Sequence, residues 1–308
     1  MASRLAPPLT LMTVHGHPDD ETVNTGGVMA RYAAEGLRVV CVVATLGEVG
    51  RIVAPALDTP ANRAALGQLR EAELRRAVEA LEPGGGIQIE LLGYRDSGMA
   101  GSPDNADPRS FWQADMHAAV NRLLEIIVRE HPDVIVSPNR FGTDGHPDHV
   151  KAAAVAKAAF ARTADPDFAW HPAKLYESVV SVGRRRERLR RLVTSGDLGT
   201  VAGAILRYVR AWRPRSELDR RRIARAQGPI TTRVDVGAQL DRKNEAMRAH
   251  RSQIDPRSRP FALRPETRRT VSPTEDFSLC ESRVPVSLPE TDLFAGLRSR
   301  AQEAPVEA

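Results

Sequence analysis

The sequence predicts a Rossmann-like, doubly wound α/β fold with a mostly parallel sheet. Apolar runs of strand length alternate with segments of helical periodicity over residues 9–182, and this alternation is typical of a parallel sheet with helices on both faces. The run at 37–44 is apolar and β-branched without alternation, which indicates a strand that is covered on both faces. A chain of 308 residues is long enough for one large domain or two small ones with a sizeable core.

The first part of the predicted core contains three strands and two helices. Its strands are apolar runs of strand length, and its helices carry apolar residues at helical spacing. In chain order we expect a strand at 9–14, a helix at 22–35, a strand at 37–44, a helix at 63–82 and a strand at 87–92. Gly36 ends the first helix, as glycines just beyond a helix often do, and Pro83-Gly84-Gly85-Gly86 ends the second.

The second part continues the alternation and then changes character. In chain order we expect a helix at 113–130, a strand at 134–137, an alanine-rich helix at 149–161, a strand at 174–182, arginine-rich helices at 184–195 and 198–226, a strand at 230–234 and a helix at 237–253. The tail from Asp255 is rich in Pro and Arg and shows little periodicity. We therefore divide the chain into an α/β catalytic core at 1–183, an arginine-rich helical insertion at 184–229 and a C-terminal part at 230–308, whose strand, helix and Pro-rich tail complete the site.

The positive charge of the chain is concentrated in one segment. The whole sequence has 44 Lys and Arg against 39 Asp and Glu, whereas fourteen arginines meet only four acids between residues 184 and 225. Helix faces exposed to solvent would explain the many arginines of this segment. The alternative is a contact with an acidic substrate or with a second subunit, and in the latter case the protein would be a homo-oligomer. Nucleic acid is the least favoured partner, because the segment has few aromatic residues and no known reading motif.

Membrane and secreted classes are disfavoured. No apolar run approaches the roughly 20 residues of a membrane-spanning helix, and the start of the chain offers Arg4 and then two prolines instead of a secretory signal. Two cysteines, Cys41 and Cys280, cannot form a disulfide framework. We therefore expect a cytoplasmic protein with no membrane partner. The absence of a glycine-rich phosphate motif also gives a nucleotide site no support.

Two clusters of His and Asp stand at matching places in the predicted fold. The first, at 15–21, directly follows the first strand, and the second, at 144–149, follows the strand at 134–137. Both come after the carboxyl end of a predicted parallel strand, which is where ligands of open α/β sheets bind. One cluster alone could be a turn with helix-capping residues, but the two together predict a shared site.

Imidazole and carboxylate side chains in this arrangement suit zinc, and a catalytic zinc keeps three protein ligands and a water. His17 and Asp20 are three residues apart on a turn, so both can face one point, and the second cluster adds a histidine from another strand end. A spare carboxylate such as Asp19 can then take the proton of the activated water, whose pKa the ion lowers to about 7.

The motifs His17-Pro-Asp-Asp-Glu21 and His146-Pro-Asp-His149 resemble the paired signatures of the LmbE-like or PIG-L family. These are zinc-dependent de-N-acetylases that remove acyl groups from amino sugars and related amides. The resemblance implies one zinc ion per chain, held by His17, Asp20 and His149, with Asp19 as the general base.

The same resemblance implies roles for the residues around the metal. His146 would stabilise the oxyanion or serve as the acid, and Asp148 would orient a histidine from behind. Arg70 and Asp96 fall where the family grips sugar hydroxyls and polar groups; for Arg70, a solvated charge on a helix is the alternative. Asp144 stands where both mycothiol enzymes of the family have a tyrosine, so either another group supplies that donor or Asp144 serves the substrate or the metal.

Two enzymes of this family resemble different segments of the chain, and the sequence does not decide between them. The loop at 92–101 resembles the actinobacterial deacetylase of mycothiol biosynthesis. The C-terminal third is more similar to mycothiol S-conjugate amidase, in the segments 230–234, 246–250, 253–256, 273–275 and 289–296.

Three functions therefore compete. The first is a metal-dependent N-deacetylase that acts on a small N-acylated amino sugar or its conjugate, and the second is an S-conjugate-type amidase. The third is a non-catalytic, metal-binding regulatory protein. Intact Asp19 and His146 favour an enzyme.

Overall fold

The computed structural model of the chain describes residues 8–179, 190–191, 228–255, 261 and 264–298. The predicted arginine-rich helices at 184–195 and 198–226 therefore lie outside the described residues, apart from 190–191. The same is true of the last ten residues of the predicted C-terminal part.

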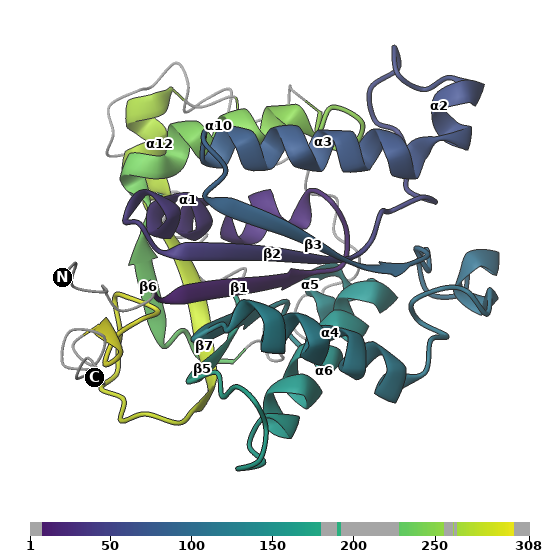
Figure 1. The fold of residues 1–308 in the computed structure, drawn as a ribbon. Helices are drawn as coiled ribbons and strands as arrows, with labels where there is room; N and C mark the ends of the chain where they lie inside the picture. The colour runs from purple at the N-terminus through teal and green to yellow at the C-terminus, as the bar shows by residue number, and fades with distance from the viewer. Residues whose placement is uncertain (1–7, 180–189, 192–227, 256–260, 262–263, 299–308) are drawn as a thin grey trace, which may run out of the picture.

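A sheet of seven strands forms the centre of the described part (Figure 1). The strands, in chain order, are β1 (Thr10–His15), β2 (Arg38–Thr45), β3 (Ile87–Tyr94), β4 (Val134–Ser137), β5 (Lys174–Ser178), β6 (Thr232–Asp235) and β7 (Thr274–Ser282). Their order across the sheet is β3-β2-β1-β4-β5-β7-β6. The first five are parallel, and β7 pairs antiparallel with both β5 and β6. This confirms the predicted doubly wound, mostly parallel sheet.

Helices cover both faces of the sheet, with α1, α3, α10 and α12 on one side and α4, α5 and α6 on the other (Figure 1). In chain order the helical elements are η1 (Glu21–Thr25), α1 (Gly26–Ala34), α2 (Pro60–Ala64), α3 (Leu66–Leu81), η2 (Pro103–Ala106), α4 (Met116–Glu130), α5 (Gly142–Gly145), α6 (Pro147–Arg162), η3 (Gly237–Gln239), α10 (Leu240–Ala249) and α12 (Pro265–Val271). Among the residues that the structure places, none of these helices is both long and apolar enough to cross a lipid bilayer.

The surroundings of strand β2 explain why its sequence lacks alternation. Val39, Cys41 and Val43 belong to the apolar core beneath α1 and α3, whereas Val40 and Val42 belong to the core beneath α4 and α6. Because successive side chains of a strand point to opposite faces, a strand between two cores must be apolar at every position.

The direction of winding reverses between β1 and β4. The connections β1–β2 and β2–β3 run through α1 and α3 on one face, and the connections β3–β4 and β4–β5 run through α4 and α6 on the other (Figure 1). β1 and β4 are nevertheless neighbours in the sheet. The loops that leave their carboxyl ends therefore diverge to opposite faces, and this divergence opens the crevice in which doubly wound folds bind ligands.

The tail from Asp255 shows little periodicity in its sequence, yet it contains the helix α12 and the strand β7. Strand β7 escapes detection because its buried residues include acids. Glu275 is buried, and its carboxylate accepts the N–H groups of Gly27 and Val28 over 2.8 and 2.9 Å in the first turn of α1. The N–H groups at the start of a distant helix satisfy the hydrogen-bonding capacity of this buried carboxylate. The sequence does not show such a contact, so the acid resembles an exposed loop residue.

Candidate active site

The two predicted clusters meet at the crevice between β1 and β4. Nδ1 of His17 lies 3.1 Å from Nε2 of His149 and 3.6 Å from Oδ2 of Asp20, and Nε2 of His149 lies 3.0 Å from that same oxygen. Zinc binds such atoms at about 2.0–2.1 Å, so tetrahedral ligand atoms lie about 3.3 Å from one another. The three predicted ligands therefore have the separations of a zinc donor set.

The outer ring nitrogens of both histidines show which way the inner lone pairs point. Nε2 of His17 lies 3.1 Å from a carboxylate oxygen of Asp148, and Nδ1 of His149 lies 3.1 Å from the carbonyl oxygen of Gly142. Both partners are acceptors, so these nitrogens carry the protons of the neutral rings. The remaining lone pairs then face each other beside the Asp20 carboxylate. Two lone pairs and an anion at this distance repel one another. Without a metal ion a proton relieves this repulsion: burial lowers the pKa of His17, but its contacts with Asp148, Asp20 and Asp96 outweigh burial and raise that pKa. Two imidazole nitrogens and a carboxylate oxygen are donors that also fit a divalent metal ion.

Other combinations of these side chains could also hold a metal ion. His17 forms one such group with His146 and His149, and another with Asp96, His146 and Asp148. The Asp148 carboxylate, however, is buried and also accepts both the N–H of Ser97 over 3.0 Å and its hydroxyl. Asp148 is thus placed to hold the His17 ring from behind, in the way that carboxylates orient metal-binding histidines.

His146 begins helix α6 and faces the same centre. Its Nδ1 accepts the N–H of Asp148 over 3.2 Å, so Nε2 carries the ring proton and lies 3.9 Å from a carboxylate oxygen of Asp96. Burial lowers the pKa of His146, and the charges of His17 and His149 lower it further. A neutral ring with an N–H on the site side can donate a hydrogen bond to a developing negative charge.

Asp19 stands beside the donor set in a rare backbone conformation. Its φ is 106°, which residues other than glycine seldom adopt, and its N–H donates to Glu21 over 2.7 Å. Burial raises the pKa of Asp19 to about 6, although the guanidinium of Arg70 acts in the opposite direction. The side chain keeps 24% of its surface exposed, so the carboxylate can reach a water or ligand in the crevice.

Arg70 is not the solvated helix charge that one interpretation expected. It is buried on α3 and donates to the carbonyl oxygens of Pro18 over 2.6 Å and Gly47 over 3.0 Å, and Nη2 lies 3.4 Å from Asp19. A Cβ at Gly47 would lie 1.9 Å from the guanidinium, and the φ of this glycine is +66°. The loop after β2 therefore depends on glycine to admit Arg70. A direct contact of Arg70 with substrate stays a prediction.

Of the other two predicted substrate residues, the structure describes the side chain of Asp96 but not that of Asp144. Asp96 is buried, accepts the N–H of Gly98 over 2.8 Å and lies 3.5 Å from Nε2 of His17. Burial alone would raise the pKa of Asp96, but the interaction with His17 outweighs it and lowers the pKa below its usual range. The backbone of Asp144 belongs to α5, and its side chain lies outside the described part of the structure.

Three supporting residues were not predicted as site residues. Ser97 donates two hydrogen bonds to Asp148. In the sequence, only the predicted site residue Asp96, directly before Ser97, pointed to this position. Glu21 closes the first cluster, so its position in the motif was visible while its role was not. His250 lies 2.7 Å from Glu21 although 229 residues separate the two, and no local spacing can reveal such a pair.

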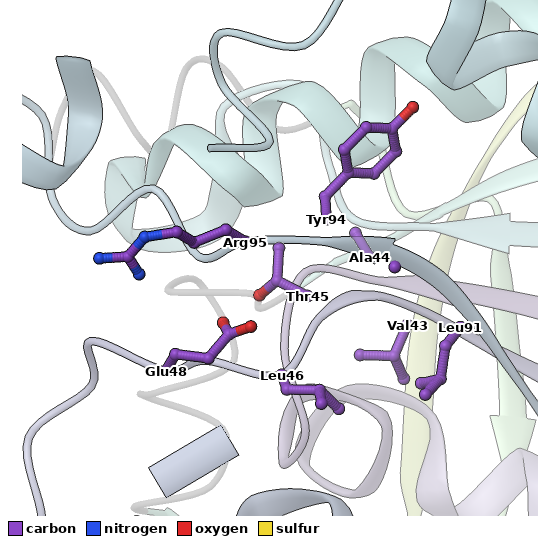
Figure 2. A pocket seen from close by; sticks show the side chains of 9 residues that line it. Val43, Ala44, Thr45, Leu46, Glu48, Leu91, Tyr94 and Arg95 are labelled. Carbon is purple, nitrogen blue, oxygen red and sulfur yellow. The ribbon is translucent and has the colours of Figure 1, made fainter. Parts of the chain in front are cut away.

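A cavity of about 300 Å³ adjoins the site at the carboxyl ends of β2 and β3 (Figure 2). Figure 2 shows Val43 and Leu91 at one end and the charged side chains of Glu48 and Arg95 at the other. Glu48 also accepts the N–H of Asp96 over 3.0 Å. One lining residue of the cavity therefore contacts Asp96 of the candidate site, although the lining contains none of the candidate metal ligands.

Comparison with known proteins gives matches along most of the chain. The sequence pattern of the GlcNAc-PI de-N-acetylase (PIG-L) family matches residues 12–160. A protein of Geodermatophilus obscurus named 1D-myo-inositol 2-acetamido-2-deoxy-alpha-D-glucopyranoside deacetylase is 37% identical over 306 residues, which cover 95% of this chain and 99% of that protein. A protein of Frankia alni with the same name, numbered 1, is 39% identical over 300 residues, or 92% of this chain and 99% of its own.

Solved structures share the fold at lower identity. The N,N'-diacetylchitobiose deacetylase of Pyrococcus horikoshii has a TM-score of 0.55 at 18% identity, over 88% of this chain and 83% of its own. The 4-carboxy-2-hydroxymuconate hydratase of Pseudomonas putida also has a TM-score of 0.55 at 18% identity, over 91% and 99%. A deacetylase and a hydratase thus share this architecture, so the fold alone does not choose the reaction.

Proposed function

The chain belongs to the PIG-L family of de-N-acetylases, and we propose that it is a zinc-dependent hydrolase that removes the acetyl group from an N-acetylated amino sugar. The observation that carries the proposal is the convergence of His17, Asp20 and His149 on one point with Asp19 beside it. Relatives that are named deacetylases and match over nine-tenths of the chain support the same reaction.

The proposed metal ligands are His17, Asp20 and His149. When bound there, Zn²⁺ would polarise the N-acyl carbonyl and lower the pKa of a water molecule to about 7. Asp148, which contacts the outer nitrogen of His17, keeps the ring in the orientation and tautomer that binding needs.

The remaining chemistry belongs to side chains of the protein. Asp19 accepts a proton from the attacking water as its oxygen bonds to the acyl carbon. The N–H of His146 stabilises the negative charge that develops on the carbonyl oxygen. As the C–N bond breaks, the proton held by Asp19 passes to the leaving nitrogen, which regenerates the carboxylate, and the products are the free amine and acetic acid, which ionises to acetate. Positioned proton transfer of this kind usually contributes about 10²–10⁴-fold.

We propose that the substrate is an amino sugar joined to a polyol, as in the name of the relatives. Asp96 and Arg70 flank the centre, and Asp144 comes two residues before His146. These three residues are the proposed contacts to the hydroxyl groups of the sugar conjugate. The cavity beside Asp96 provides further room next to the site.

The test is acetate release from purified protein. The substrates are 1D-myo-inositol 2-acetamido-2-deoxy-α-D-glucopyranoside, N-acetylglucosamine and an amide-linked thioether conjugate of the same amino sugar. We expect the inositol conjugate to be preferred, a chelator to abolish turnover, and added Zn²⁺ to restore it. Faster cleavage of the thioether conjugate would assign the S-conjugate-type amidase activity instead. Metal binding without turnover of any of the three would favour the non-catalytic, regulatory alternative.

A further inference from the structure

Two hydrogen bonds hold the main chain of Asp19 in its unusual conformation. With φ at 106°, the residue lies in a region that side-chain-bearing residues rarely occupy. Its N–H donates to Oε2 of Glu21 over 2.7 Å, and its carbonyl oxygen accepts the N–H of Val23 over 3.0 Å. These bonds fix the peptide groups on both sides of Asp19, and so they fix the direction in which its carboxylate points.

The second oxygen of Glu21 is held by a residue from the C-terminal third of the chain. Oε1 lies 2.7 Å from Nε2 of His250 and also accepts the hydroxyl of Thr22. All three side chains are fully buried. A buried carboxylate that loses a donor must turn toward another one, so the bond from His250 limits where the rest of the Glu21 carboxylate can lie.

His250 is in turn anchored to the helical layer above the sheet. It directly follows α10, and Ser252 donates both its N–H and its hydroxyl, over 2.9 and 2.6 Å, to the buried carboxylate of Glu73 on α3. Figure 1 shows α3 and α10 side by side in this layer. Nδ1 of His250 has no hydrogen-bond partner among the described residues, so the polar contacts of this side chain are made by Nε2.

We propose that Glu21 and His250 are positioning residues, through which the C-terminal segment sets the conformation of Asp19. The chain of contacts runs from Glu73 through the turn at Ser252 to His250, then to Glu21 and the N–H of Asp19. The inference rests on the proposed function only where it gives Asp19 the role of general base. Because one carboxylate oxygen of Glu21 accepts the N–H of Asp19 and the other contacts His250, a displacement of the pair changes the main chain of Asp19 directly.

Two amide substitutions of His250 differ in whether they can reach Glu21. His250→Gln places its amide nitrogen near the position of imidazole Nε2 and can still donate to Glu21, whereas the shorter His250→Asn places it near Nδ1. Tyr32→Phe is the matched control, because it removes the hydroxyl of another buried side chain, which donates to Asp292 and accepts the N–H of Leu293, each over 2.9 Å, away from the metal centre. We would measure kcat, KM, metal content and Tm for each variant.

We expect His250→Asn to lower kcat by about 10–100-fold, because a small displacement of a catalytic group can cost about 10²-fold. KM should stay within about threefold and metal content should stay unchanged, since the ligands are intact. His250→Gln should recover most of the loss, and Tyr32→Phe should lower Tm without lowering kcat. A parental kcat in His250→Asn, or equal losses in both amide variants that follow Tm, would overturn the positioning role.

Crystal structures of Glu21→Gln and His250→Asn give a readout that does not depend on turnover. We expect Asp19 to leave its positive φ, or to lose its N–H contact at residue 21, in both variants. If Asp19 keeps its conformation and this contact in both, the proposal is wrong. A parent protein that releases no acetate would instead contradict the proposed function, and the crystallographic comparison would still decide this inference.

Discussion

The carboxylate of Asp148 lies 3.1 Å from Nε2 of His17 and presents the opposite nitrogen of that ring to His149. Asp148 is the second residue of α6, whereas His17 follows β1. This contact therefore connects the loop after β1 with the start of α6, on the two sides of the crevice. The first prediction follows from this contact.

Asp148→Asn should weaken metal binding by about 10–100-fold, as the loss of such supporting carboxylates typically does. An amide cannot accept from His17 and from both donors of Ser97 at once. Competition with a chromogenic chelator measures the affinity, and Glu71→Gln on the exposed side of α3 serves as the control. Parental affinity in Asp148→Asn would show that the His17 ring needs no support.

His17→Ala and His149→Ala should each remove most of the bound metal. Each deletes one of three converging donors, and zinc sites of this kind have three protein ligands. Elemental analysis of purified proteins, with the parent expected at one ion per chain, tests the assignment. Full metal content in both variants would overturn the assignment, whereas metal loss in His17→Ala but not in His149→Ala would favour the alternative group of His17, Asp96, His146 and Asp148.

Asp19→Asn should keep its metal and lose about 10²–10⁴-fold in kcat, because an amide cannot accept the proton of water. Single-turnover acetate release and metal analysis on the same sample separate the two effects. If activity stays within a few-fold of the parent, the base is another residue, and Asp144 would be examined next.

Arg70→Lys should lower kcat while the fold and the metal are retained. The guanidinium bridges the carbonyl oxygens of Pro18 and Gly47 and approaches Asp19, and a single ammonium cannot reproduce this planar bridge. A rise in KM alone, with an unchanged kcat, would indicate that Arg70 acts on the substrate and not on the loop that carries Asp19.

Lys174→Met should destabilise the protein by about 3–5 kcal/mol, because it leaves a buried charge without its partner. Nζ of Lys174 lies 2.6 Å from Glu290 and donates to the carbonyl oxygen of Ala295 over 2.7 Å, and both charged side chains are buried. Urea unfolding measures the loss. The double variant Lys174→Met/Glu290→Leu should recover part of it, and an unchanged midpoint in the single variant would contradict the role of the pair.

The predictable part of the molecule is the part that local patterns determine. The apolar run of β2 revealed a strand between two cores, and the strand before each His cluster placed both clusters at the same edge of the sheet. Polar residues after neighbouring strands converge there, so the sequence could place His17, Asp20 and a histidine of the second cluster in one site. The choice of His149 as that histidine came from the family resemblance.

The rest depends on contacts between distant segments. Glu275 and His250 look ordinary in their own segments, and each acquires its meaning from a partner more than two hundred residues earlier. Strand β7 was missed for the same reason, because its buried Glu275 is satisfied by groups that belong to α1 and α10.

The bond between Glu275 and the start of α1 joins two segments that are synthesised at very different times. Translation delivers all three candidate ligands within the first 149 residues, so an emerging chain carries them long before Glu275 leaves the ribosome. His250, which lies behind Asp19 through Glu21, arrives equally late. In a nascent chain the three candidate ligands are therefore available to a metal ion well before the residues that hold the main chain of Asp19 and the start of α1 have been made.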